Sequence, residues 1–114
     1  MTPGEQKWLE RFNKIIEKNI DIVPLTNEVL AEELNISERQ LFRKIKEFST
    51  LPPQKYLRKY RLHKAMRFLK SGKHRTVKET SFAVGFLKVS YFIAQFEKEF
   101  GKRPLQILKD SGWR

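Results

Sequence analysis

The chain has 114 residues and a net charge of +11, from 24 Lys and Arg against 13 Asp and Glu. This length suits one domain with one core or two small ones, and it excludes a large multi-domain enzyme. Hydrophobic residues make up 39% and charged residues 32%, as in folded rather than disordered chains. No apolar run approaches the roughly 20 residues of a membrane span, and the N-terminus lacks the pattern of a signal peptide. The sequence contains no cysteine, which excludes disulfides, cysteine zinc sites and thiol catalysis.

The basic side chains are unevenly distributed along the chain. Residues 1–50 hold 8 basic and 9 acidic side chains, whereas residues 51–114 hold 16 basic and 4 acidic ones. Nine Lys and Arg occur between Pro53 and Arg75 without one acid, although ordinary protein surfaces mix the two signs. This pattern favours a polyanionic partner, most often nucleic acid and sometimes an anionic membrane surface.

The predicted fold class is all-α, because the segments between prolines and glycines have helical periodicity and none alternates with period 2. Three helix starts have recognisable caps. Thr26 can cap the second helix, while Ser37 with Gln40 and Thr76 with Glu79 have the spacing of a capping box. The predicted helices, about seven in number, span residues 5–19, 26–34, 37–48, 53–72, 76–85, 88–100 and 104 onward.

Proline and glycine mark further helix boundaries. Pro53 and Pro104 suit the first turn of a helix, where the missing backbone N–H is not needed. Gly72 and Gly101 follow predicted helix ends, where they can supply the left-handed backbone of a C-terminal cap.

The chain also repeats itself weakly. Residues 34–36 (Leu-Asn-Ile) align with 84–86 (Val-Gly-Phe) at an offset of 50. After one extra residue the offset becomes 51, and 53–57 then aligns with 104–108. Each half contains a helix, a tight turn, a second helix and a proline-initiated helix, which predicts two copies of one unit.

The helix over 37–48 has an apolar face and a basic face. Leu41, Ile45 and Phe48 share the apolar face at helical spacing. A short helix, a tight turn and a capped second helix with a cationic outer face form the helix-turn-helix pattern. The second helix of that pattern fits the major groove, where arginine can bond guanine O6 and N7 and an aromatic ring can touch a thymine methyl. The residues alone also allow an amphipathic core helix with a solvated basic side. The outer face carries Arg39, Gln40, Phe42, Arg43 and Lys46.

The helix over 88–100 gives a weaker signal. Its aromatic row, Phe92, Phe96 and Phe100, is expected to be core. Its outer face is only mildly polar and has one cation, so it could read bases loosely or contact the DNA backbone only. The outer side chains are Ser90, Tyr91, Ala94, Gln95 and Lys98.

The helix over 53–72 has one apolar stripe, while Leu57 and Phe68 lie away from it, so we expect it to connect the two repeats. Its cations can neutralise phosphates, which gives affinity without sequence information. These cations are Arg58, Lys59, Arg61, Lys64, Arg67 and Lys70.

Residues suited to metal binding or catalysis are few. His63 and His74 lie on or beside a basic segment and we expect no carboxylate near them, so we expect them to be solvated or to contact phosphate. No phosphate loop, nucleophile elbow or carboxylate cluster occurs, so no cofactor and no enzymatic activity are predicted. Three carboxylates of the second helix are expected to be exposed, and either solvated or offered to a partner protein: Glu28, Glu32 and Glu33.

The sequence resembles the C-terminal DNA-binding domain of the AraC/XylS family of bacterial transcription regulators, over residues 25–108. The first matching motif is Leu-Ala-Glu-Glu-Leu-Asn-Ile-Ser-Glu-Arg-Gln-Leu-Phe-Arg-Lys-Ile-Lys at 30–46. The second is Val-Gly-Phe at 84–86, Ser-Tyr-Phe at 90–92 and Phe-Gly-x-x-Pro at 100–104. The first helix and first motif also resemble the output domain of hybrid two-component sensors, so the chain is expected to be either a small regulator or a fragment of a larger one.

The resemblance implies a single DNA-binding region, 1–114, with helix-turn-helix units over 5–52 and 73–114 joined by a linker helix over 53–72. It implies that two recognition helices read successive major-groove segments on one DNA face. Residues 93–94 (Ile-Ala) stand where the family often has polar or basic residues. The implied base contacts are Arg39, Phe42, Arg43, Ser90, Tyr91 and Ala94. The DNA backbone contacts that we expect are Gln40, Lys46, Arg58, Lys59, Arg61, Lys88 and Lys98.

Three functions remain open from the sequence. The first is sequence-specific binding of double-stranded DNA by a bacterial transcription regulator. The second is a non-specific nucleic-acid or nucleoid protein, and the third a helical protein-interaction module with RNA polymerase as a candidate partner. For each we expect a cytoplasmic protein, no membrane contact and a monomeric state for this chain.

Overall fold

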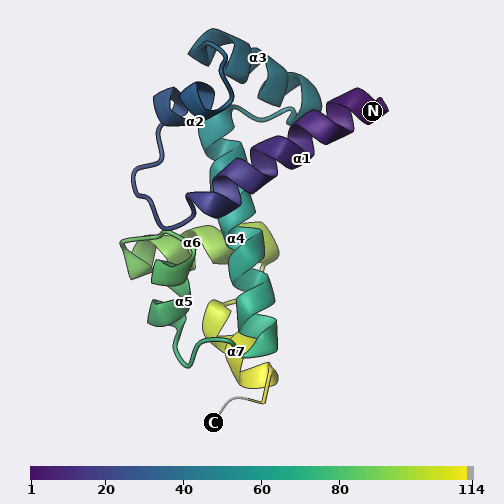
Figure 1. The fold of residues 1–114 in the computed structure, drawn as a ribbon. Helices are drawn as coiled ribbons and strands as arrows, with labels where there is room; N and C mark the ends of the chain where they lie inside the picture. Colours follow the sequence, from purple (N-terminus) through teal and green to yellow (C-terminus); the bar gives the residue numbers. More distant parts are fainter. Residues whose placement is uncertain (113–114) are drawn as a thin grey trace. The chain divides into compact units, whose positions relative to one another are not determined.

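The computed structural model of the protein describes residues 1–112. Residues 113–114, which end the predicted second unit, lie outside the described part. The described residues form seven α-helices and no strand, which confirms the all-α prediction (Figure 1). The helices are α1 (Pro3–Lys18), α2 (Asn27–Glu33), α3 (Glu38–Ser49), α4 (Pro53–Ser71), α5 (Val77–Ala83), α6 (Val89–Phe100) and α7 (Pro104–Asp110).

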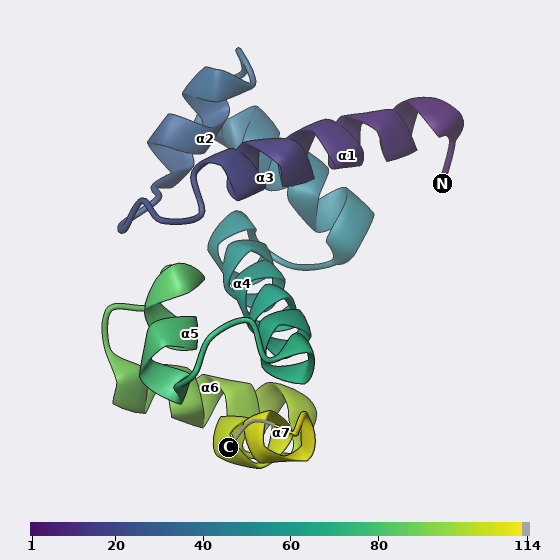
Figure 2. The same cartoon turned by 60° about the horizontal axis from the view of Figure 1, so that its bottom comes forward.

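The chain divides into two compact units. The first is Met1–Arg58 and the second begins at Lys59, so the division falls inside α4. Each unit therefore contains a helix pair, α2–α3 or α5–α6, that corresponds to one of the repeats in the sequence (Figure 2).

The core of the first unit forms where α1 packs with the α2–α3 pair. The Trp8 ring stacks on Phe12 at a centroid distance of 5.7 Å and meets Phe48 edge-on at 5.5 Å. The hydroxyl of Tyr56 donates a hydrogen bond to Asn13 Oδ1 at 2.6 Å. The buried apolar residues of this unit are Phe12, Ile16, Leu25, Leu30, Ala31, Leu34, Leu41, Ile45 and Leu57.

The core of the second unit is an aromatic cluster between its part of α4 and helices α5–α7. Phe92 and Phe96 are fully buried with ring centroids 5.6 Å apart. The apolar stripe predicted for α4 packs against them, and Phe68 packs partly on the same core. The buried members are Leu62, Ala65, Leu69, Val84, Phe86, Phe92, Phe96, Ile107 and Leu108.

The turn inside each helix pair has the same backbone structure. Asn35 and Gly85 have positive φ angles of 56° and 92°. The next residue, Ile36 or Phe86, donates its N–H to the carbonyl five residues back, at 3.1 and 2.9 Å. This is the Schellman arrangement, which closes a helix and reverses the chain in few residues.

The ends of α3 and α6 are also equivalent. Thr50 and Gly101 have φ angles of 64° and 70°, and each donates its N–H to the carbonyl four residues back at 2.8 Å. Pro53 and Pro104 then begin α4 and α7, and both side chains are fully buried. The offset of 51 found in the sequence therefore relates equivalent structural positions.

Two predicted helix starts need correction. The first helix begins at Pro3 rather than residue 5, because Thr2 and Glu5 form a capping box with Pro3 in the first turn. At α5 only half of the predicted box forms. The Thr76 hydroxyl accepts from the Glu79 N–H, but the Glu79 carboxylate accepts from the N–H of Arg75.

The left-handed caps allow a prediction about stability. A Cβ at Gly101 would meet no atom within 4 Å, so Gly101→Ala should destabilise the protein through backbone strain alone. We expect a loss of about 1–2 kcal/mol in the free energy of unfolding, measured with urea. Thr50→Gly should raise the free energy of unfolding. The gain should be smaller than the loss caused by Gly101→Ala, because glycine loses more conformational entropy on folding. A neutral Gly101→Ala substitution would contradict the assignment of strain to this cap.

Candidate nucleic-acid interface

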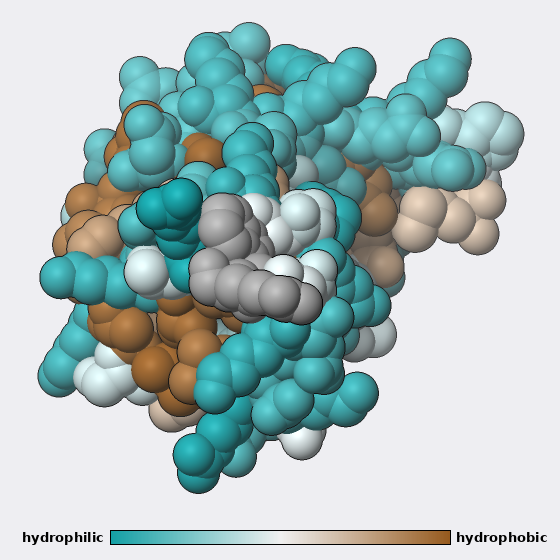
Figure 3. Space-filling view, turned by 90° about the horizontal axis from the view of Figure 1, so that it is seen from below, coloured by the Kyte–Doolittle hydropathy of each residue, from teal (hydrophilic) through white to brown (hydrophobic). Residues whose placement is uncertain are grey.

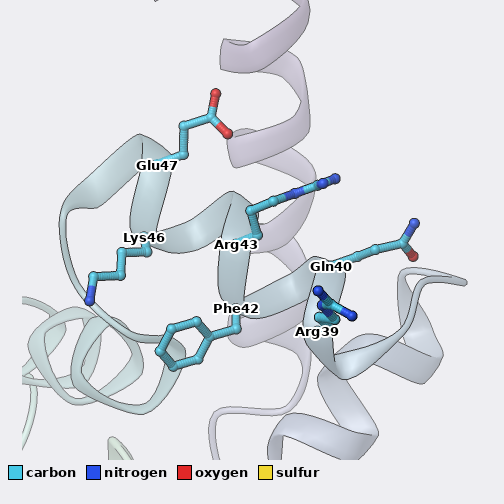
Figure 4. Close-up of a pocket in the computed structure, with 6 residues that line it drawn as sticks. All are labelled: Arg39, Gln40, Phe42, Arg43, Lys46 and Glu47. Carbon is cyan, nitrogen blue, oxygen red and sulfur yellow. The ribbon is translucent and has the colours of Figure 1, made fainter.

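The outer face of α3 gathers the side chains that the sequence predicts to contact DNA. Leu41 and Ile45 are fully buried on the inner side, which turns the opposite side of the helix to solvent. Arg39, Phe42 and Arg43 are exposed there. Figure 4 shows Phe42 and Lys46 directed to one side and Arg43 to the other. This face forms a shallow depression lined by Arg39, Gln40, Phe42, Arg43, Lys46 and Glu47.

The α3 face combines an exposed aromatic ring with cations. Phe42 is 45% exposed, and the Lys46 ammonium lies 5.7 Å from its ring centroid. Lys44, by contrast, lies over the Trp8 ring at 5.3 Å, on the flank of the helix. The guanidinium groups of α3 can therefore reach an anionic ligand, while Lys44 packs on the unit's own aromatic side chain.

The outer face of α6 is exposed but carries less charge. Ser90, Tyr91 and Ala94 are exposed, whereas Phe92 and Phe96 on the opposite side are fully buried. The helix lacks a side-chain cap at Lys88. The sequence thus predicted correctly which side of each helix faces solvent, while DNA contact itself stays a prediction.

The expected phosphate contacts differ in exposure. Five of them are exposed, and Arg58 is half-buried. Arg61 is 7% exposed, so the prediction that it contacts DNA is wrong. The exposed members are Gln40, Lys46, Lys59, Lys88 and Lys98.

Arg61 is instead part of the second helix-turn-helix turn. Its Nη1 donates a hydrogen bond at 2.9 Å to the carbonyl of Gly85, the residue with positive φ. Burial lowers the pKa of its guanidinium, which nevertheless stays charged because arginine titrates far above neutral pH. Its spacing of four from Ala65 and eight from Leu69 puts it on the apolar stripe of α4. That spacing was a signal that could have identified it as buried.

The prediction that His63 has no carboxylate near it is also wrong. Its Nε2 lies 2.9 Å from Glu99 Oε2, and Lys59 Nζ lies 3.9 Å from the same oxygen. Its ring also meets Phe100 edge-on at 5.0 Å. These contacts join α4 to α6 within the second unit, and no sequence pattern could indicate them because 36 residues separate His63 from Glu99.

The predicted acidic face of α2 loses one member. Glu28 and Glu32 are exposed, but Glu33 accepts a 2.7 Å hydrogen bond from Asn19 Nδ2 and pairs with Lys18 at 3.3 Å. Glu33 therefore links the end of α1 to α2 through these contacts within the first unit, rather than remaining available to a partner protein.

Residues 1–112 offer neither a metal site nor a membrane span. That part of the chain holds no group of three side chains able to share a metal ion, and no helix long and apolar enough to cross a membrane. Apolar surface does gather in one patch, on the left of the face drawn in Figure 3. The large exposed apolar side chains of the second unit are Phe82, Leu87, Tyr91 and Leu105.

The position of Arg61 predicts a structural rather than a DNA-binding effect. Arg61→Ala should lower the free energy of unfolding by about 1–3 kcal/mol, because the buried Gly85 carbonyl loses its donor. Arg67→Ala, in the exposed part of the same helix, should stay within about 0.5 kcal/mol of the parent in the same urea titration. If Arg61→Ala left the stability unchanged and reduced the salt dependence of DNA binding, the result would instead support the predicted contact between Arg61 and a DNA phosphate.

Known sequences share the helix-turn-helix units of this chain. A family model described as a helix-turn-helix domain matches residues 30–110. Over 80 residues the chain is 36% identical to the HTH-type transcriptional activator RhaS of Salmonella arizonae, a match covering 70% of this chain and 28% of RhaS. Over 102 residues it is 29% identical to Histidine kinase P4 of Formosa agariphila, covering 90% of this chain and 7% of the kinase. The chain thus spans a small part of these relatives.

Solved structures share the fold over nearly the whole chain. An AraC-type transcriptional regulator from Chromobacterium violaceum superposes with a TM-score of 0.84 at 25% identity, covering 96% of both chains. The C-terminal domain of the two-component response regulator yesN from Fusobacterium nucleatum has a TM-score of 0.76 at 31% identity, covering 90% of this chain and 98% of that domain.

Proposed function

The chain belongs to the AraC/XylS family of DNA-binding transcription-regulator domains, and on that premise we propose that it binds double-stranded DNA sequence-specifically. In this proposal α3 and α6 each enter a segment of the major groove. The observation that carries it is the repeated helix pair, whose second helix buries one face and exposes the opposite one in both units. A helix presented in this way fits the width of the major groove.

In the first unit, we assign the base contacts to Arg39, Phe42 and Arg43. Two exposed guanidinium groups one helical turn apart can each bond guanine O6 and N7 in bidentate fashion. The half-exposed Phe42 ring can contact a thymine methyl. Gln40 and Lys46 flank the row and would hold α3 in register through phosphate oxygens.

In the second unit, we assign the base contacts to Ser90, Tyr91 and Ala94. Lys88 at the start of α6 and Lys98 near its end are exposed and would neutralise phosphates on either side. Lys59 is half-exposed at 53% and shares Glu99 with His63, so Glu99 offsets part of its charge. Its contribution to the salt dependence should therefore be smaller than that of Lys98.

The role of the whole protein extends the proposal. We propose that this chain is the DNA-binding part of a cytoplasmic bacterial transcription regulator and is monomeric by itself. RNA polymerase is the protein partner we consider, with the exposed Glu28 and Glu32 of α2 available to basic residues. Size-exclusion chromatography with light scattering tests the monomeric state directly.

Selection from a randomised duplex library, at near-physiological salt, tests the proposed function. We expect two enriched sequence blocks about one helical turn apart, since units that read successive major-groove segments follow the DNA repeat. A single enriched block would mean that only one of the two units recognises bases. No enrichment, despite binding that weakens steeply with salt, would favour a non-specific nucleic-acid-binding protein instead.

Two variants should separate base reading from phosphate binding. Arg43→Ala should cost about 1–3 kcal/mol on the selected duplex and relax specificity at one base pair. Lys98→Ala should weaken all duplexes alike and lower the slope of log K against log salt by about 1. Fluorescence anisotropy on selected and scrambled duplexes measures both. Equal weakening on both duplexes by Arg43→Ala would contradict its assignment.

A further inference from the structure

The two recognition helices present different chemistry at equivalent positions. The N-caps Ser37 and Lys88 and the left-handed C-caps Thr50 and Gly101 align α3 with α6 at an offset of 51 residues. Arg39 and Arg43 of the first unit then correspond to Ser90 and Ala94 of the second. The second unit therefore lacks both guanidinium groups that can bond guanine in bidentate fashion.

The second unit also has one residue more between its turn and its recognition helix. Ile36 is followed directly by the cap residue Ser37, whereas Leu87 stands between Phe86 and the cap residue Lys88. Leu87 is 71% exposed, the largest fraction among the large apolar side chains that residues 1–112 expose. The added residue thus places an apolar side chain in solvent at the entrance of α6.

Tyr91 is a second large exposed side chain, on α6 itself. It stands at the position of Gln40 in the first unit and is 43% exposed. One side of its ring is supported by Phe86, which is 7% exposed and lies 6.1 Å away between ring centroids. Tyr91 and Ala94 are three residues apart and therefore lie on one side of α6, while Leu87 directly precedes the N-cap residue of that helix.

Core packing does not explain the exposure of Leu87, Tyr91 and Ala94, because none of the three belongs to the core of the second unit. That core is formed in part by Phe86, Phe92 and Phe96, which are buried. Exposed apolar groups that gather on one surface indicate a ligand with apolar groups of its own. In the major groove of DNA the apolar group is the C5 methyl of thymine.

We propose that the second unit recognises its half-site through thymine methyl groups, which Leu87, Tyr91 and Ala94 contact. Its half-site is then rich in A·T pairs, whereas the first unit selects guanines through Arg39 and Arg43. Ser90 supplies a single hydroxyl that suits several bases. This inference rests on the proposed function, because it requires α6 to face the major groove.

Replacing thymine by uracil in the selected duplex tests the inference, since uracil lacks only the methyl group. Each contacted thymine in the second half-site should weaken binding about fourfold when replaced, because a buried methyl contributes about 0.8 kcal/mol and 1.4 kcal/mol corresponds to tenfold. Arg43→Ala identifies which block belongs to the first unit. Anisotropy titrations at one fixed salt concentration give the ratios.

Two variants assign the effect to side chains. Leu87→Ala should keep the fold, because the side chain is 71% exposed and precedes α6. In this variant, at least one thymine-to-uracil replacement in the second half-site should no longer weaken DNA binding. Tyr91→Phe should keep the full uracil effect, because the ring and not the hydroxyl makes the contact. Leu105→Ala, an equally small change at a 51% exposed leucine of α7, should leave both affinity and uracil effect unchanged.

The outcomes separate this inference from the function on which it rests. Two enriched blocks with no uracil effect in the second one would overturn the inference and leave sequence-specific binding in place. A second block without thymine, or a uracil effect that survives Leu87→Ala at every position, would also overturn it. No enriched sequence at all would refute the proposed function itself.

Discussion

The helix-turn-helix turn is the constraint on which each unit depends. A left-handed residue, Asn35 or Gly85, lets the following N–H return to the carbonyl five residues back, so the second helix leaves at a fixed angle to the first. That angle directs one face of α3 or α6 into its core and the opposite face to solvent. In the second unit, α4 reinforces the turn, because Arg61 donates to the carbonyl of Gly85. A basic residue is thereby used for structure in a segment otherwise rich in exposed cations.

One scaffold can therefore carry two kinds of recognition surface. The inner positions of α3 and α6 are occupied by Leu41 and Ile45 or by Phe92 and Phe96, all fully buried, and they tolerate little change because each fills its unit's core. The outer positions bear no such restriction. They carry guanidinium groups in the first unit and mainly apolar or small side chains in the second. Under the proposed function, the first unit recognises guanines and the second unit recognises thymine methyl groups.

The sequence predicted what local rules determine. Helix caps, proline starts and helical periodicity gave all seven helices and the exposed faces of α3 and α6, since each rule acts within a few residues. Contacts between distant residues were missed, as for His63 with Glu99 and Asn19 with Glu33. Arg61 is buried, which its place on the apolar stripe of α4 indicates and its charge does not. Which of the exposed side chains touch DNA depends on the ligand, so neither the sequence nor the fold determines it alone.

Under the proposed function, α3 and α6 present equivalent positions to DNA and differ in the side chains there. The library selection repeated with the double variant Ser90→Arg, Ala94→Arg examines this equivalence, because both positions are exposed and correspond to Arg39 and Arg43. We expect the second enriched block to gain guanine while the first block is unchanged. An unchanged second block, with the double variant folded and binding DNA, would contradict the equivalence of the two helices.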